Sequence, residues 1–272
     1  MDFITKKILI LVKTYPSISK KYTELVCTAG MDEDGNWFRL YPIPFRKLND
    51  EQQYPKYRWI EARMYKSNDD PRIESYKVDF ERIKLLEQIE ASDWGRKSNT
   101  VLKQKIHNDL SKLIEESNST DMSLAVFKPT KIIDFIWEKD DREYSKERLA
   151  AIEAERKQLD LFSNGEDDDV FKIVDKLPYK FSYIFEDING KQSTLMIEDW
   201  EVGAAFWRWK DYYKSEEVAL QKIREKFFNN YAKNRDLHFF LGTTRQYHGW
   251  AKNPFIIIGL FPLPKVLQKS LF

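Results

Sequence analysis

The stretch that decides the fold is DLHFFLGTTRQYHGWAKNPFIIIGLF, which runs from Asp236 to Phe261. Its two apolar runs, Leu237–Leu241 and Phe255–Phe261, have the length of buried strands. The segment between them is polar and aromatic. Rigid strands that carry such a loop are the usual arrangement of a binding site. Because the chain contains no decisive catalytic signature, this loop is the main guide to function.

The loop combines side chains that suit nucleic acid. Cations can contact phosphate, rings can stack on bases, and amides can hydrogen bond to base edges. The alternative is a structural loop whose tryptophan fills the core, and the sequence leaves both interpretations open. The candidate ligand-binding residues of the loop are Arg245, Tyr247, His248, Trp250 and Lys252.

The N-terminal half predicts a strand-rich module that suits a small, partly open barrel. Its clearest hairpin joins Tyr22–Met31 to Asn36–Tyr41 through the turn dipeptide Asp34-Gly35. In the returning strand, Trp37 and Arg39 lie two residues apart, so they share a face and could line a second ring-and-cation surface. Further strand-like segments are Lys7–Lys13, Tyr57–Tyr65, Arg72–Phe80, Ser123–Phe127 and Lys131–Trp137.

Helical spacing predicts a helix from Asn99 to Glu116 and a charged helix from Asp140 to Leu161. Gly165 and four consecutive acids then indicate an exposed linker. A second hairpin turns at Asn189-Gly190, and helices follow that begin at Asp199 and after Ser215. The whole pattern predicts an α+β fold of two β-barrel-like modules with inserted and flanking helices. The expected division is an N-terminal module at 1–138, a charged helix and linker at 139–169, and a C-terminal module at 170–272.

Composition limits the function classes. Aromatic residues make up 15% of the chain, which favours a core built from rings over a stacking surface for any single ring. The formal net charge is only +1, but residues 170–272 carry 16 Lys/Arg against 11 Asp/Glu, so an anion would meet this part. Cys27 is the only cysteine, which excludes an internal disulfide and a multi-cysteine zinc site. No signal peptide or span of 18 apolar residues is present, so a cytoplasmic location without a membrane is expected.

The candidates for catalysis are few. His238 and His248 with Asp236 could form a metal or acid–base site, but their spacing matches no ligand motif. Glu198, Asp199 and Glu201 could hold a nuclease metal, although helix capping accounts for all three. No cofactor motif occurs. We therefore assign no catalytic, metal or cofactor residue, and the sequence leaves open whether the protein is an enzyme.

Three motifs carry a family resemblance. They are YTELVCTAGMDEDGNWFRLYP, SLAVFKP and LMIEDWEVGAAFW, and at these the sequence resembles an uncharacterised prokaryotic family of dual OB-domain-containing proteins. The resemblance implies OB-like modules and, by analogy of fold, nucleic-acid binding; it supplies no catalytic residues. The residues that match the family's first hairpin are Cys27, Ala29, Gly30, Gly35, Trp37, Arg39 and Pro42.

These observations favour a non-catalytic prokaryotic protein that binds nucleic acid or a nucleotide-like anion through its ring-and-cation surface. A metal-dependent nuclease is one alternative. The other is a protein-interaction subunit of a defence or mobile-element system, whose exposed rings would meet a protein partner.

Overall fold

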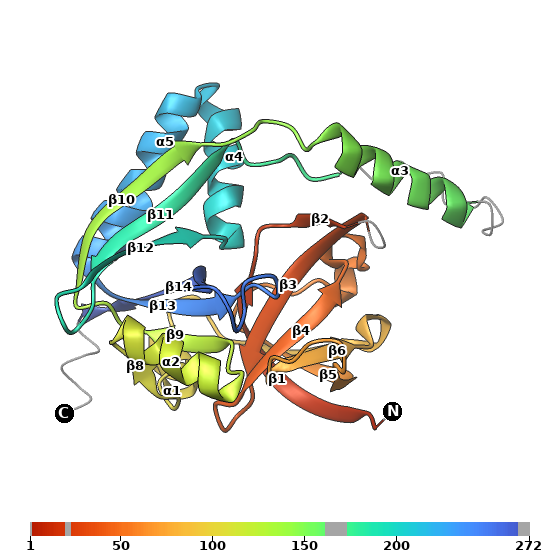
Figure 1. Cartoon of the computed structure of the whole chain (residues 1–272), viewed down its shortest axis with the longest axis horizontal. Helices are drawn as coiled ribbons and strands as arrows, with labels where there is room; N and C mark the ends of the chain where they lie inside the picture. Colours follow the sequence, from red (N-terminus) through yellow and green to blue (C-terminus); the bar gives the residue numbers. More distant parts are fainter. Residues whose placement is uncertain (1, 20–22, 161–172, 266–272) are drawn as a thin grey trace.

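The N-terminal strands close into a barrel in the computed structural model, which describes residues 2–19, 23–160 and 173–265 (Figure 1). The first strand, β1, pairs with β3 on one edge and with β5 on the other, which closes the ring in the order β1-β3-β4-β6-β5. All neighbours are antiparallel except β4 and β6. The barrel strands are β1 Ile4–Lys13, β3 Thr23–Met31, β4 Trp37–Ile43, β5 Arg58–Lys66 and β6 Ser75–Val78, with β2 Ser17–Ser19 on β3 and β7 Lys84–Gln88 on β5.

Local turn chemistry forms the first hairpin as predicted. Gly35 has a φ of +88°, and the Asp32 carboxylate accepts hydrogen bonds from the backbone of Asp34 and Asn36. Gly30 has a different role, because a Cβ there would lie 2.2 Å from the Leu9 carbonyl oxygen. The glycine thus allows β3 to approach β1 closely enough for the barrel to close.

The second sheet has seven strands in the order β10-β11-β12-β14-β13-β9-β8. The pairs β12–β14 and β8–β9 are parallel and the others antiparallel. The predicted turn at Asn189-Gly190 joins β11 to β12, with Gly190 at a φ of +72°. The strands are β8 Ile106–His107, β9 Leu124–Phe127, β10 Lys131–Lys139, β11 Tyr179–Glu186, β12 Gln192–Ile197, β13 Arg235–Thr243 and β14 Phe255–Pro264.

Helices cover one face of this second sheet. In Figure 1, α4 and α5 lie behind β10 to β12, and α3 extends away from the sheet. Asp199 caps α4 as predicted by accepting a hydrogen bond from the Glu201 amide, and Ser215 caps α5. The α-helices are α1 Trp94–Val101, α2 Leu110–Thr120, α3 Lys146–Asp160, α4 Trp200–Tyr213 and α5 Glu216–Arg224. Helix α5 continues as the π-helix η4 Glu225–Ala232. The short 3₁₀ helices that flank the barrel strands are η1 Phe45–Lys47, η2 Asp50–Gln52 and η3 Phe80–Arg82. The α+β fold with two β-rich modules is therefore confirmed.

Three apolar clusters hold the fold together. One fills the barrel, and one lies between the second sheet and its helices. The third, which we call the junction core, joins the outside of the barrel to the free face of the second sheet. The twelve largest fully buried side chains are all rings, so the prediction of an aromatic core is confirmed. The junction core consists of Leu9, Leu11, Val12, Ala29, Met31, Ile89, Val101, Leu124, Val126, Phe240, Ile258, Phe261 and Leu263.

Two local predictions are wrong. The single helix expected from Asn99 to Glu116 is divided, because Ile106–His107 pairs with β9 and Asp109 caps a new helix. The strands expected to end at Tyr41 and Phe261 continue through a proline instead: β4 includes Pro42, which follows a cis peptide bond, and β14 includes Pro262. The acidic linker expected at 162–169 lies outside the described residues.

Sheet membership divides the chain earlier than the expected boundary after residue 138. Strands β8, β9 and most of β10 precede that position, and all three belong to the second sheet. The chain therefore crosses from the barrel to the second module before β8. The segment that enters β9 then lies between the two modules, where Ser123 contacts Arg39 and Glu74 and accepts a hydrogen bond from the Thr243 amide.

Candidate functional site

The loop between β13 and β14 is braced by its own hydrogen bonds. The Thr244 carbonyl accepts from the amides of Tyr247 and His248, at 3.2 and 3.0 Å, and the Trp250 indole donates to the Gln246 carbonyl at 2.6 Å. Gly249 has a φ of +78° at the tip of the loop. These contacts fix the backbone, so the loop presents its side chains from a defined position.

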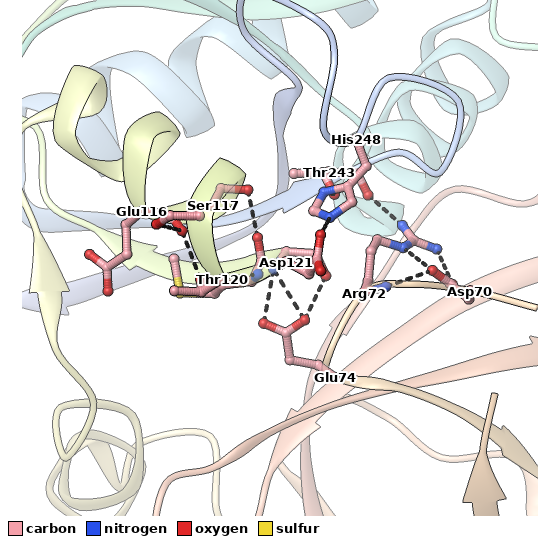
Figure 2. A network of polar contacts seen from close by, with 12 residues as sticks. Asp70, Arg72, Glu74, Glu116, Ser117, Thr120, Asp121, Thr243 and His248 are labelled. Carbon is pink, nitrogen blue, oxygen red and sulfur yellow. Dashed lines mark hydrogen bonds and ion pairs between the residues drawn. The ribbon is translucent and has the colours of Figure 1, made fainter. Parts of the chain in front are cut away.

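His248 attaches this loop to the end of β13. Its side chain is buried, its Nδ1 lies 3.0 Å from the Thr243 hydroxyl, and its Nε2 lies 3.7 Å from the Asp121 carboxylate (Figure 2). Burial lowers the pKa of His248, and the nearby Arg72 guanidinium lowers it further. His248 was a candidate ligand contact, and the structure instead places it under the loop.

A loop of the barrel contacts the same residue, Thr243. The segment 67–74 joins β5 to β6, and in it Arg72 donates to the Thr243 carbonyl at 2.7 Å. Asp70 orients the guanidinium with two hydrogen bonds of 2.8 and 2.7 Å, as Figure 2 shows. Burial opposes the charge of the Asp70 carboxyl, but the Arg72 hydrogen bonds outweigh it and lower its pKa to about 2. The candidate loop is therefore connected to the barrel by charged groups.

Arg39 lies inside the molecule, so it does not line the ring-and-cation surface that was expected for it and Trp37. It is 3% exposed, and its guanidinium donates to the carbonyl and hydroxyl of Ser123 and to the sulfur of Cys27. Glu74 binds the same serine, with 2.9 and 2.8 Å contacts to its amide and hydroxyl. Arg39 is covered because the outer face of β4 packs against the segment that enters β9. It positions the two modules and does not line an open groove.

The exposed part of the site is a pair of rings. Trp250 is 70% exposed and Tyr247 is 44% exposed, and their ring centroids lie 5.6 Å apart. Arg245 and Lys252 are exposed on the same loop. Arg245 is close enough to Asp69 of the barrel loop to lower the pKa of that carboxyl, although the hydrogen bond from Lys77 is the larger cause. We call Arg245, Tyr247, Trp250 and Lys252 the loop surface.

Trp37 packs against β13. It is half-buried and meets Phe240 edge to face at 5.7 Å. It also lines a cavity of about 300 Å³ with Glu74, Lys105 and His107. Ile73, which follows the Arg72 anchor, lines the same cavity, so this cavity adjoins the anchor from the barrel side.

The two histidines considered for catalysis do not come together, and the acids considered for a metal site pair with a lysine. His238 is buried and lies five positions before Thr243 on β13, so it does not meet His248. Asp199 caps α4 and accepts two hydrogen bonds from the Lys56 ammonium, at 2.9 and 2.7 Å. Within the described ranges, no group of three or more His, Cys, Asp or Glu side chains could hold a metal ion. Glu201 lies 3.5 Å from the Lys56 ammonium, so Asp199 and Glu201 form an ion-pair cluster with Lys56.

Sequence reasoning missed the anchor residues Asp70, Arg72, Glu74 and Asp121. The run of polar residues around Pro71 indicates a turn, and that was the only local signal. Nothing local reveals that this turn meets the β13–β14 loop, because the partners are separated by 171 positions for Arg72 and Thr243.

These features define an α+β protein with two β-rich modules and a braced, ring-bearing loop at their junction. The chain belongs to the family described as "Domain of unknown function (DUF8757)", whose model matches residues 82–272. The model described as "Domain of unknown function (DUF8758)" matches residues 4–103. No curated protein matches the chain.

Among solved structures, the chain is similar to one titled "Structure of murine DNA binding protein bound with ds DNA". The two share 12% identity over 97% of this chain and 99% of the other, with a TM-score of 0.31. A TM-score of this size does not establish a shared fold or a shared ligand. Separately, none of the helices in the described part of the chain has the length and apolar character needed to cross a membrane.

Proposed function

We propose that this protein binds single-stranded nucleic acid, without cleaving it, through the loop surface. The observation that carries the proposal is the exposed ring pair, Tyr247 and Trp250, on a loop that also exposes Arg245 and Lys252. Adjacent exposed rings form an apolar patch, and such patches often mark interaction sites. Stacking on unpaired bases is sequence-tolerant and supplies about 1–3 kcal/mol per base, while the two cations would contact phosphate.

We also infer that the barrel is OB-like. Counted along the chain, its five strands are arranged in the ring as first, second, third, fifth and fourth. OB folds are five-stranded Greek-key barrels that bind oligonucleotides on strands 2 and 3 and on the loops after strands 1 and 4. The loop after the fourth strand is here residues 67–74, which carries Arg72 and contacts Thr243. The loop surface therefore adjoins one of the places where OB barrels bind nucleic acid.

The junction core restricts where a strand could lie. Ala29 and Met31 of the second barrel strand are fully covered by the second sheet. Arg39 of the third barrel strand is buried as well. A bound strand would therefore pass over the loop surface and the 67–74 loop, and would not cross the strand face that OB barrels use. This favours a short binding site with few phosphate contacts.

The test is fluorescence anisotropy with labelled single-stranded DNA and RNA, titrated at several salt concentrations. Replacing Trp250 by Ala should weaken binding by about tenfold or more, because one stacking platform is lost. The double variant Arg245→Ala, Lys252→Ala should flatten the dependence of log K on log salt by about 1.4, which corresponds to about 0.7 per phosphate contact on single strands.

Tyr212→Ala is the matched control for the loss of an exposed ring. Tyr212 is 77% exposed and lies near the end of α4, outside the loop surface. Its removal should leave the affinity for oligonucleotides unchanged. The proposal fails if the wild-type protein binds no oligonucleotide even at low salt, or if Trp250→Ala binds as tightly as the wild type.

A further inference from the structure

A second cavity lies at the other end of the β13–β14 hairpin. Its volume is about 410 Å³, within the range of small-ligand sites. Leu260 and Pro262 of β14 form part of its wall, several residues beyond the loop surface. The remaining wall comes from the residues just before β5, from the end of β7 and the segment that follows it, from α1, from the start of α4 and from η4. The cavity is therefore built by both modules and is separate from the loop surface.

Lys97 is the unusual charge of this cavity. The residue is 2% exposed, and its ammonium donates one hydrogen bond, of 2.7 Å, to the Ala91 carbonyl. It lies 4.5 Å from the centre of the Tyr57 ring and 4.7 Å from that of Trp94. Asp93, Glu90 and Glu201 act on it only at longer range, and no carboxylate in the described part of the chain forms an ion pair with it. The two ring faces offset only part of the cost of burying this ammonium, because it has three donor hydrogens but, among the described residues, one hydrogen-bond acceptor and no ion-pair partner.

Lys56 lines the same cavity and, unlike Lys97, forms ion pairs with residues that the structure describes. Its ammonium contacts Asp199 at 2.7 Å and Glu201 at 3.5 Å. Burial opposes its charge, but these carboxylates outweigh burial and raise the pKa of Lys56. Lys56 is therefore satisfied within the protein, whereas Lys97 is the cation of this cavity that lacks an anion.

Gln88 supplies an unused acceptor. Its amide nitrogen donates to the carbonyls of Lys56 and Ile89, both at 3.1 Å, which fixes the orientation of the amide group. The opposite atom, Oε1, is buried and has no hydrogen-bond partner among the residues that the structure describes. A buried acceptor without a donor costs free energy unless a ligand supplies the donor.

Tyr57 is held in an unfavourable backbone conformation beside these two groups. Its φ is +62°, a region that bulky residues rarely adopt. The conformation is locked by a 2.6 Å hydrogen bond from its amide to the Ile10 carbonyl. Such strain often occurs where a side chain must be held in place for a ligand. With Trp94 and Tyr231, the cavity then has three rings in its wall.

We propose that this cavity binds a nucleoside monophosphate. The phosphate would pair with Lys97, a hydroxyl or ring N–H of the nucleoside would donate to Gln88 Oε1, and the base would stack among Tyr57, Trp94 and Tyr231. This ligand class combines the anion, the donor and the flat ring that the cavity wall requires. The proposal is independent of strand binding at the loop surface.

Isothermal titration with AMP, GMP, CMP and UMP tests the proposal, with adenosine and inorganic phosphate as partial ligands. At least one nucleotide should bind more tightly than either partial ligand. Lys97→Met should weaken that binding about tenfold or more, whereas Lys97→Arg, which keeps the charge, should bind within a few-fold of the wild type. Lys103→Met is the matched control, since Lys103 is exposed just beyond α1.

Thermal denaturation without ligand gives a second measurement. If Lys97 is kept for an anion, Lys97→Met should be at least as stable as the wild type, because a costly buried charge is removed. Several outcomes would overturn the proposal: no binding of any of the four nucleotides at about 5 mM, equal binding by Lys97→Met, binding of phosphate alone with the same affinity, or marked destabilisation of Lys97→Met. Loss of oligonucleotide binding in Trp250→Ala would not affect this test.

Discussion

Neighbouring residues of the β13–β14 loop have opposite roles. Trp250 is 70% exposed, whereas His248, two positions earlier, is 9% exposed and holds Thr243. Sequence alone could not assign these roles, because both side chains suit a ligand and a core equally well. The tertiary neighbours Arg72 and Asp121 decide that His248 faces inward.

The burial of His248 predicts a dependence of stability on pH. Its pKa is lowered from 6.5, first by burial and then by Arg72, despite the opposing carboxylates of Asp121, Glu74 and Asp70. Below pH 6.5 the unfolded chain therefore binds a proton that the folded chain does not, so this histidine costs stability as pH falls through that value.

His248→Asn provides the comparison, because asparagine can still hydrogen bond to Thr243 but does not titrate. The stability advantage of the wild type over this variant should shrink between about pH 7.5 and about pH 5.5. Urea unfolding at both pH values measures it. An advantage that grows at the lower pH would mean that Asp121 stabilises the protonated ring and would contradict the prediction.

At the scale of elements, local chemistry predicted most of the strands and turns. The hairpins at Asp34-Gly35 and Asn189-Gly190 formed where expected, because the turn residues themselves carry the required positive φ. The helix expected across residues 99–116 did not form as one piece, because Ile106–His107 pairs with a strand that lies later in the chain. Arg39 was misjudged for the same reason, since its partner Ser123 is 84 positions away. In both cases a contact between distant segments determined the structure, and the periodicity of the sequence does not reveal such contacts.

Closure of the barrel depends on Gly30. Replacement by Ala would place a methyl group 2.2 Å from the Leu9 carbonyl oxygen, in backbone that cannot move without opening the β1–β3 pair. We expect Gly30→Ala to destabilise the protein by about 3 kcal/mol.

Gly95→Ala is the matched control for this prediction. Gly95 lies in α1, where a Cβ would meet only a side-chain oxygen of Asp93 at 3.6 Å. This variant should be unchanged or stabilised by up to about 1 kcal/mol, because alanine favours a helix. Urea denaturation of the two variants distinguishes a packing clash from a general intolerance of alanine.

At the scale of the whole molecule, the two modules share one apolar interior. The junction core takes fully buried residues from β1 and β3 on one side and from β9, β13 and β14 on the other. The Lys56–Asp199 ion pair adds a buried polar link between the barrel and α4. Neither module could unfold alone without exposing this surface to water.

We therefore expect the two modules to unfold in one transition. Hydrogen exchange followed through a denaturant series should show protection lost at the same midpoint in β4 and in β11. Ile258→Ala, which creates a cavity on the second-sheet side of the junction core, should lower both midpoints equally. If β4 keeps its protection in this variant while β11 loses it, the modules are independent.

During synthesis, the two edges of β1 can pair with neighbouring strands long before its outer face can be covered by the second sheet. Its partners β3 and β5 follow within residues 23–66, but the side chains that cover Leu9 and Val12 include Phe261 and Leu263. The outer face of β1 is therefore covered only after β14 has been synthesised, much later than β3 and β5. Until then the nascent chain carries an uncovered apolar stripe, and surface of this kind makes an incomplete chain prone to aggregation.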